Sequence, residues 1–180
     1  MVDHVFDIYK AHYESPVGSL TISADYIGIT KLEFGKLDQP RGSSTVLKQA
    51  LKNLDQYFEG RLYRFDCPLS LKGTSFQKDV WQALQRIPYG AFPSYGDIAA
   101  DIGRPSAVRA VGLANNKNPI PIIIPCHRVI GRDGSLTGYV AGLGVKRFLL
   151  DLELQSDTLS IPRATLHRAA SSQVLSAFRF

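Results

Sequence analysis

The first third of the chain alternates apolar and polar residues, which is the pattern of β-strands. The alternation is weak over residues 9–13 and clear over 20–24, and a further β-rich run covers 27–34. Turn-forming residues separate the first two segments, in Ser15-Pro16-Val17-Gly18-Ser19. The pattern predicts two or three antiparallel strands, with one more strand near residues 65–69.

Helical periodicity begins after a polar loop at residues 39–44. Apolar side chains then recur every three or four positions, which predicts an amphipathic helix ending at Gly60. The residues on its apolar face are Leu47, Leu51, Leu54 and Phe58. A second helix is predicted from the capping box of Thr74 and Gln77 to the Pro-Tyr-Gly stop at residues 88–90.

Two short helical segments follow, over residues 95–102 and 107–114. Ser94 and Asp97 are spaced to cap the first segment, and Gly103 ends it. The second segment consists largely of small residues. Two short helices joined by a tight, glycine-containing turn are typical of a helix-turn-helix.

Prolines dominate the next stretch of the chain. Pro119, Pro121 and Pro125 exclude a helix there. We therefore expect residues 119–125 to be extended and buried.

The end of the chain contains one more amphipathic pattern and then a change of composition. Apolar residues at helical spacing predict a last helix over 145–152. From Gln155 on, the chain is rich in Ser, Ala and Arg. This composition allows a weak helix around residues 165–177 or disorder.

These elements define an α+β fold. We expect a sheet-rich N-terminal domain with one helix over residues 1–72, and a mainly helical domain with a helix-turn-helix over 73–154. A tail of unassigned role covers 155–180. A chain of 180 residues suits one domain, or two small domains that share an interface.

Composition excludes several classes of protein. No apolar run is long enough to span a bilayer, and residues 1–7 lack the basic start and apolar core of a signal peptide, so we expect an intracellular protein without membrane association. The two cysteines, Cys67 and Cys126, form no C-x-x-C pair, which disfavours a zinc ribbon or a thioredoxin-like site. A disulfide between them would be uncommon inside a cell.

The net charge of +5 is unevenly distributed. Residues 1–74 hold nine basic and nine acidic side chains, residues 75–155 hold nine and six, and residues 156–180 hold three and one. An excess of this size by itself indicates only a solvated basic surface. Other motifs must therefore decide whether this half of the chain faces nucleic acid.

Cys126 and His127 are the main candidates for chemistry. A thiolate is a nucleophile, and an adjacent imidazole can act as its base. Neighbours in an extended segment point to opposite sides, so a bridging water suits this pair better than direct contact. Glu153 follows Leu149 by four residues on the predicted core-facing stripe and could orient the imidazole. The alternative is an inert buried thiol, a hydrogen-bonded core histidine and a solvated glutamate at a helix end.

Four further side chains are candidates for binding. Arg109 should point outward from a helix of small residues, where it could enter a groove or fill the gap left by an extruded base, or simply lie on the surface. Tyr139 could stack on a flipped base or anchor a loop. Tyr95 could press on a phosphate, and Asn118 could lock a turn or brace the site.

Together these residues resemble the active-site signature of the O6-alkylguanine-DNA alkyltransferase family. The resemblance covers residues 74–154 strongly, and the first third resembles the ribonuclease H-like N-terminal domain of the family only loosely. The shared motifs are Asn118-Pro119-Ile120-Pro121-Ile122, Pro125-Cys126-His127-Arg128-Val129-Ile130, Ser94-Tyr95-Gly96, Ala107-x-Arg109-Ala110-Val111-Gly112, Gly138-Tyr139 and Lys146-x-x-Leu149-Leu150-x-x-Glu153.

The resemblance implies single-use repair of alkylated DNA. Cys126 would take the alkyl group from O6 of an extruded guanine. His127, backed by Glu153, would draw the thiol proton through a water molecule. Tyr95 would crowd the 3′ phosphate and protonate N3 of the leaving guanine, and Asn118 would support the active-site turn.

The resemblance also implies the partners. These are double-stranded DNA, bound through its minor groove, and O6-alkylguanine lesions, with no metal and no organic cofactor. We expect a monomer in the cytoplasm, or in the nucleus of a eukaryote. The residues implied at the DNA are Ser94, Tyr95, Ala107, Arg109, Ala110, Gly112 and Asn115. Those implied at the base pocket are Pro121, Val129, Tyr139 and Val140.

One departure from the family pattern concerns the base pocket. Val140 and Ala141 follow Tyr139, where relatives commonly have a small or hydroxyl-bearing residue and glycine. A hydrogen bond to the base is thereby lost and the pocket is narrower, which puts bulky O6 groups and O4-alkylthymine in question. Two other functions stay open: a helix-turn-helix protein that binds lesions without chemistry, and a thiol hydrolase.

Overall fold

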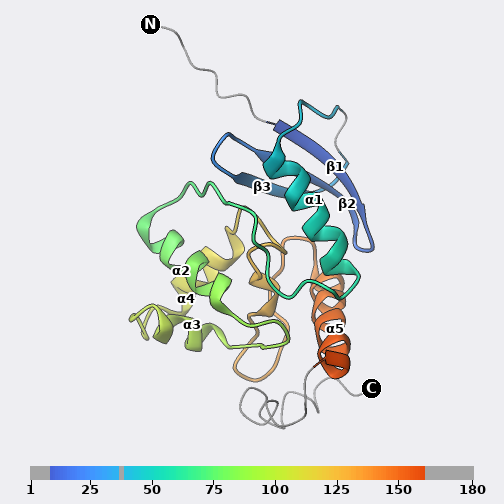
Figure 1. Ribbon diagram of the computed structural model, residues 1–180. Helices are drawn as coiled ribbons and strands as arrows, with labels where there is room; N and C mark the ends of the chain where they lie inside the picture. Colours follow the sequence, from blue (N-terminus) through green and yellow to red (C-terminus); the bar gives the residue numbers. More distant parts are fainter. Residues whose placement is uncertain (1–8, 37–38, 161–180) are drawn as a thin grey trace, which may run out of the picture. The chain divides into compact units, whose positions relative to one another are not determined.

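The computed structural model describes residues 9–36 and 39–160, with side chains as far as Gln155. The chain divides into two compact units. Of the described residues, the N-terminal unit comprises 9–36, 39–73 and 119–123, and the C-terminal unit comprises 74–118 and 124–160. The segment 119–123 therefore groups with the N-terminal unit, although the residues before and after it in the chain belong to the C-terminal unit. The α+β class predicted from the sequence is confirmed (Figure 1).

The described part of the N-terminal unit is built on an antiparallel sheet of three strands. Strands β1 (Tyr9–Ser15), β2 (Gly18–Ala24) and β3 (Ile29–Phe34) lie in the order β1-β2-β3. The central strand buries the most surface, with Leu20, Ile22 and Ala24 inaccessible to solvent. Helix α1 (Thr45–Phe58) is capped by Ser44 and packs against all three strands, as Figure 1 shows.

The strand predicted near residues 65–69 is wrong. Only a single parallel bridge forms there, between Leu69 and Ile29. Pro68 accepts a hydrogen bond from the Ile29 amide at 2.8 Å, but as a proline it has no N–H with which to continue a ladder. Gly28 permits this close approach, because a Cβ at that position would lie 2.6 Å from the Pro68 carbonyl oxygen.

The expectation of an extended segment over residues 119–125 is also wrong. The chain turns at Ile122, whose φ of 73° lies in the left-handed region, and a single 3-10 turn, η1 (Cys126–Arg128), follows. Prolines exclude a helix, but they allow turns as readily as extended chain. The Asn118 side chain donates to the Ile124 carbonyl at 2.8 Å and closes the loop between them.

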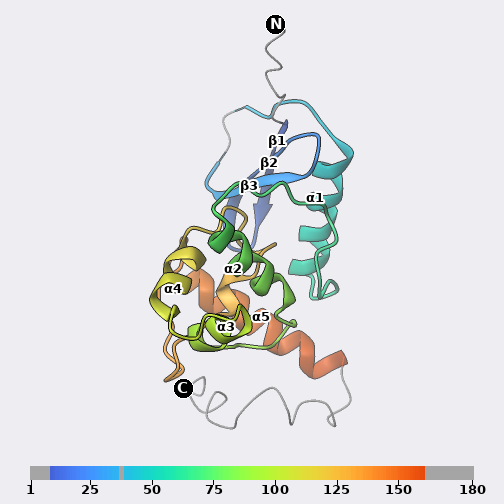
Figure 2. The same cartoon turned by 90° about the vertical axis from the view of Figure 1, so that its left-hand side faces the viewer.

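Four helices form the described part of the C-terminal unit: α2 (Ser75–Arg86), α3 (Tyr95–Asp101), α4 (Val108–Asn116) and α5 (Leu143–Ser160). The predicted capping boxes at Thr74 and Ser94 are both present. Helices α2, α3 and α4 pack on one another, as Figure 2 shows, and the Trp81 indole donates to the Ala114 carbonyl at 2.9 Å.

Helix α5 is longer than predicted. No Gly or Pro interrupts residues 145–160, so the helix continues past the predicted boundary at 154. The weak helix or disorder expected around 165–177 lies outside the described residues. None of the helices in the described part of the chain is long and apolar enough to cross a membrane.

Candidate active site

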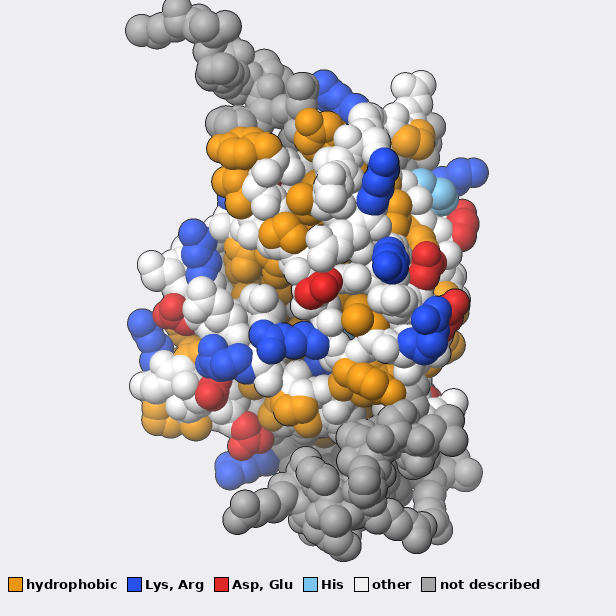
Figure 3. Space-filling model, in the orientation of Figure 1, with side chains coloured by type: hydrophobic (Ala, Val, Ile, Leu, Met, Phe, Trp, Pro, Cys, Tyr) orange, Lys and Arg blue, Asp and Glu red, His pale blue; other side chains and the backbone are white. Residues whose placement is uncertain are grey.

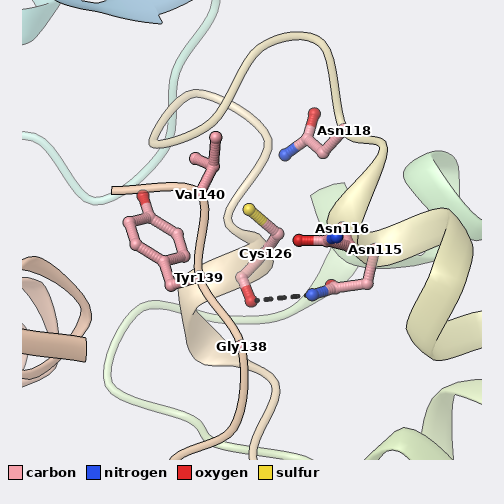
Figure 4. A pocket seen from close by; sticks show the side chains of 7 residues that line it. All are labelled: Asn115, Asn116, Asn118, Cys126, Gly138, Tyr139 and Val140. Carbon is pink, nitrogen blue, oxygen red and sulfur yellow. Dashed lines mark hydrogen bonds between the residues drawn. The ribbon is translucent and has the colours of Figure 1, made fainter. Parts of the chain in front are cut away.

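Cys126 begins the η1 turn and is almost completely buried, with 3% of its surface exposed. Its side chain borders a cavity of about 10 Å³, which is room for roughly one water molecule. Figure 4 shows the lining, which comes from the end of α4 and the residue after its cap, from η1, and from the loop that precedes α5. The lining residues are Asn115, Asn116, Asn118, Cys126, Gly138, Tyr139 and Val140.

The buried thiol is neutral at physiological pH. Burial raises the pKa of Cys126 to about 11, although a hydrogen bond from Asn118 and the charge of Lys146 oppose the rise. Burial likewise raises the pKa of Cys67 to about 11. Both cysteines are free, so the disulfide considered from the sequence does not form. Cys126 therefore needs a base, or a change of surroundings, before it can act as a nucleophile.

Glu153 is the centre of a buried hydrogen-bond network. Its carboxylate accepts from His127 Nε2 at 2.8 Å and from Arg128 Nε at 2.8 Å. Arg128 Nη2 adds a bond at 3.0 Å, and the Gly90 amide donates at 3.1 Å. Glu153 and His127 are inaccessible to solvent. The alternative of a solvated glutamate at a helix end is therefore wrong.

This network fixes the protonation of its members. Burial alone would raise the pKa of Glu153, but the charges and hydrogen bonds of His127 and Arg128 outweigh it and lower that pKa to about 2. Burial lowers the pKa of His127. The imidazole is therefore neutral at pH 7 and donates from Nε2 to Glu153, which leaves the lone pair on Nδ1. Arg128 keeps the carboxylate ionised when the histidine carries no charge.

Sequence reasoning missed the roles of two residues of this site, Arg128 and Lys146. Arg128 also donates to the Ile87 carbonyl at 2.6 Å. Lys146 is fully buried on α5, and its ammonium donates to the carbonyls of Val129 at 2.7 Å and Thr137 at 2.9 Å. Burial lowers the pKa of Lys146 to about 8. Helical spacing in the sequence could have identified Lys146, because it precedes Glu153 by seven residues and so lies on the same face of the helix.

The loop before α5 contacts the site at two points. Thr137 donates its hydroxyl to the Tyr95 hydroxyl at 3.2 Å, and the Tyr139 ring lies edge-on to His127 with centroids 6.5 Å apart. Val140 also lines the cavity, and 61% of its surface is exposed to solvent. Burial raises the pKa of Tyr95, which keeps its phenol protonated.

A second, larger hollow lies along α4. It has a volume of about 370 Å³ and is lined by Tyr95, Val108, Arg109, Gly112, Asn116, Thr137 and Gly138. Asn116 and Gly138 border both this hollow and the cavity at Cys126. The cavity at Cys126 and the hollow along α4 are therefore neighbours.

The remaining residues expected at the DNA or the base lie in different places. Ser94 caps α3, Ala107 caps α4 without a side-chain bond, and Ala110 is exposed on α4. Val129 is buried and offers its carbonyl to Lys146. Pro121 belongs to the segment that groups with the N-terminal unit and lines neither hollow.

Basic side chains lie on one face of the C-terminal unit. Figure 3 shows Lys and Arg side chains, mixed with a smaller number of carboxylates, over helices α2 to α4. One such pair is Arg86 with Asp101 at 2.5 Å, with both side chains about half exposed. Among the described residues, no group of three or more His, Cys, Asp or Glu side chains is arranged to hold a metal ion.

A buried cysteine with a histidine–glutamate pair, beside a helix-turn-helix, defines a class of proteins that combine thiol chemistry with an exposed recognition helix. Comparison with known proteins identifies the family. Residues 75–155 match the DNA-binding domain of 6-O-methylguanine DNA methyltransferase, and residues 8–71 match its ribonuclease-like domain. The chain belongs to this family.

The relatives span most of the chain. The methylated-DNA–protein-cysteine methyltransferase of Methanosarcina acetivorans is 48% identical over 81% of this chain and 98% of its own length. The constitutive enzyme of Bacillus subtilis is 46% identical over 81% of this chain and 94% of its own length. A crystal structure of Mycobacterium tuberculosis OGT in complex with DNA matches with a TM-score of 0.75 at 47% identity, covering 81% of this chain and 92% of that one.

Replacing Glu153 by Gln should destabilise the protein by about 3–5 kcal/mol, because Arg128 would remain buried without its counter-charge. Urea unfolding at pH 7 measures the loss. The control is Asp101→Asn in the exposed pair with Arg86, which should cost less than about 1 kcal/mol. Equal losses in the two variants would contradict the importance of the buried network.

The stability that Glu153 contributes should depend on pH. Its folded pKa lies below the unfolded value of about 4.3, so the contribution is complete above that value and is lost as the pH falls toward about 2. Unfolding of the wild type and of Glu153→Gln across this range tests the sign. The difference in unfolding free energy between them should shrink as the pH falls.

The reaction of Cys126 with iodoacetamide should be slow at pH 7 and should accelerate about tenfold per pH unit as the thiolate fraction grows. Mass spectrometry of the Cys126 peptide separates this reaction from that of Cys67. A rate that does not change between about pH 6 and pH 9 would instead mean that the thiolate already exists in the resting protein.

Proposed function

We propose that this protein repairs alkylated DNA by transferring an alkyl group from O6 of guanine to Cys126, once per molecule. The observation that carries the proposal is the buried thiol of Cys126 beside the His127–Glu153–Arg128 network. This thiol lies near helix α4, which is bordered by a large hollow. The family of the chain and the identity of its relatives support the same reaction.

The reaction proceeds in one displacement. His127 takes the thiol proton through a water molecule, and Glu153 stabilises the imidazolium that forms. The thiolate attacks the alkyl carbon, the bond from that carbon to O6 breaks, and its electron pair remains on the guanine. Tyr95, whose raised pKa keeps it protonated, supplies a proton to N3 of the leaving base. The thioether is stable, so the protein is consumed.

The DNA is bound through its minor groove by the α3–α4 helix-turn-helix. Arg109 is exposed, lines the hollow along α4, and fills the space that the extruded nucleotide leaves. Unstacking a base costs a few kcal/mol, and less for a lesion that pairs poorly. Contacts from Lys and Arg to phosphates offset this cost, which makes binding sensitive to salt.

The resting cavity is much smaller than a purine, so the loop that carries Tyr139 and Val140 must move before a base can enter. Tyr139 then lines the base pocket, and Asn118 supports the turn that holds Cys126. The protein acts as a monomer, in the compartment that holds the DNA. Neither a metal nor an organic cofactor takes part in the displacement.

A lesion-binding protein without chemistry would leave the nucleophilic Cys126 without a purpose. A thiol hydrolase needs direct contact between the cysteine and its base. Here the two residues are neighbours in one 3-10 turn, where successive side chains diverge by about 120°. The number of alkyl groups transferred per protein molecule distinguishes both alternatives from repair.

Intact-protein mass spectrometry after mixing with a duplex that contains O6-methylguanine should show the addition of one methyl group per molecule, located on the Cys126 peptide. Cys126→Ala should gain no mass and still bind the duplex, and Cys67→Ser should react like the wild type. An unchanged mass in the wild type under reducing conditions would rule out the proposal, and repeated turnover would indicate a hydrolase.

Arg109→Ala should slow methyl transfer from duplex DNA by about tenfold or more, because the variant cannot stabilise the extruded state. Transfer from a single strand that carries the same lesion should change much less. Arg86→Ala, which removes an exposed arginine of α2, provides the control. Equal losses on both substrates would argue against a role in extrusion.

A further inference from the structure

The hydroxyl of Thr137 contacts the atom of Tyr95 that takes part in the proposed reaction. Its Oγ1 donates to the Tyr95 phenol oxygen at 3.2 Å. Both side chains line the hollow along α4, where Tyr95 is half-buried and Thr137 is exposed. The bond joins the loop before α5 to helix α3, which lies 42 positions earlier in the chain. It is therefore a tertiary contact, created by the fold rather than by the local sequence.

Other contacts hold both partners of this bond in place. The Thr137 carbonyl accepts from Lys146 Nζ at 2.9 Å, and the same ammonium binds the Val129 carbonyl at 2.7 Å. On the other side, Gly112 of α4 faces the Tyr95 ring, and a Cβ at that position would lie 3.9 Å from a ring carbon. The Thr137 hydroxyl is thus presented by a fixed stretch of backbone to a ring that lies beside a helix.

A phenol that gives up its proton needs support for the charge it acquires. While the Tyr95 O–H points at N3 of the base, the hydroxyl pair has one arrangement, in which Thr137 donates and Tyr95 accepts. A hydrogen bond donated to the charged form of a group favours that form. Burial and the charge of Cys126 raise the pKa of Tyr95, and the hydrogen bond from Thr137 opposes both. Thr137 therefore makes the phenol a better acid.

We infer that Thr137 is a positioning residue, whose hydroxyl orients Tyr95 and stabilises the phenolate formed when Tyr95 protonates the leaving guanine. The inference rests on the proposed function and names the residue that supports its acid. In this step the Tyr95 O–H bond breaks, a bond from N3 to that proton forms, and the electron pair stays on the phenol oxygen. Thr137 keeps its own proton. The attack also turns the Cys126 thiolate into a neutral thioether, and the phenolate then recovers a proton from solvent.

The test separates proton transfer from the rest of the reaction. Single-turnover rates of methyl transfer are measured on two otherwise identical duplexes. One contains O6-methylguanine, and the other contains its 3-deaza analogue, which has C–H in place of N3 and accepts no proton there. The wild type should be slower on the analogue by about tenfold or more. Thr137→Val keeps the shape of the side chain and the carbonyl that binds Lys146. It should lose about tenfold on O6-methylguanine and nothing on the analogue.

Thr137→Ser is the matched control, since serine keeps the hydroxyl and lacks only the methyl group. It should react like the wild type on both duplexes. Equal slowing of Thr137→Val on the two duplexes would overturn the inference, because Thr137 would then act on DNA binding or on the loop. So would an unslowed Thr137→Val, a serine variant as slow as the valine variant, or a wild type with equal rates on the two duplexes. Failure of the proposed function is recognised by a different result, which is no methyl transfer from either duplex to the wild type.

Discussion

The carboxylate of Glu153 is the group on which the rest of the site depends. A carboxylate without solvent access is expensive to bury, and here Arg128, His127 and the Gly90 amide all donate to it. These bonds join helix α5 to the η1 turn and to the segment that follows α2. The position of Cys126, which begins η1, follows from them.

In the same network, one residue neutralises the charge of Glu153 and another is left to act as the base. Arg128 balances the charge of Glu153, so the imidazole of His127 is free to remain neutral and act as a base. Lys146 donates to the carbonyls of Val129 and Thr137, and its positive charge lowers the pKa of Cys126. The thiol thus rests in its neutral form next to groups that favour its ionisation.

Local rules predicted much of the fold from the sequence. The strands of the sheet, the amphipathic helices and both capping boxes depend on residues close in the chain, and they formed as expected. The strand at 65–69 failed because Pro68 cannot extend a ladder. Prolines ruled out a helix over 119–125, but the choice between extended chain and turn depended on the bond from Asn118 to Ile124.

The sequence predicted some residues of the site and missed others, for a similar reason. Cys126, His127 and Glu153 stand out by chemistry and helical spacing. Arg128 and Lys146 act through partners distant in sequence, and neither residue type suggests burial by itself.

The excursion at residues 119–123 has a consequence for dissecting the molecule. The backbone amide of Leu32 donates to the Pro119 carbonyl at 2.9 Å, so the sheet edge is completed by chain from the second half of the sequence. A fragment that stops at residue 73 would expose that amide. A single cut after residue 73 therefore leaves the N-terminal unit incomplete, because its segment 119–123 stays with the C-terminal fragment.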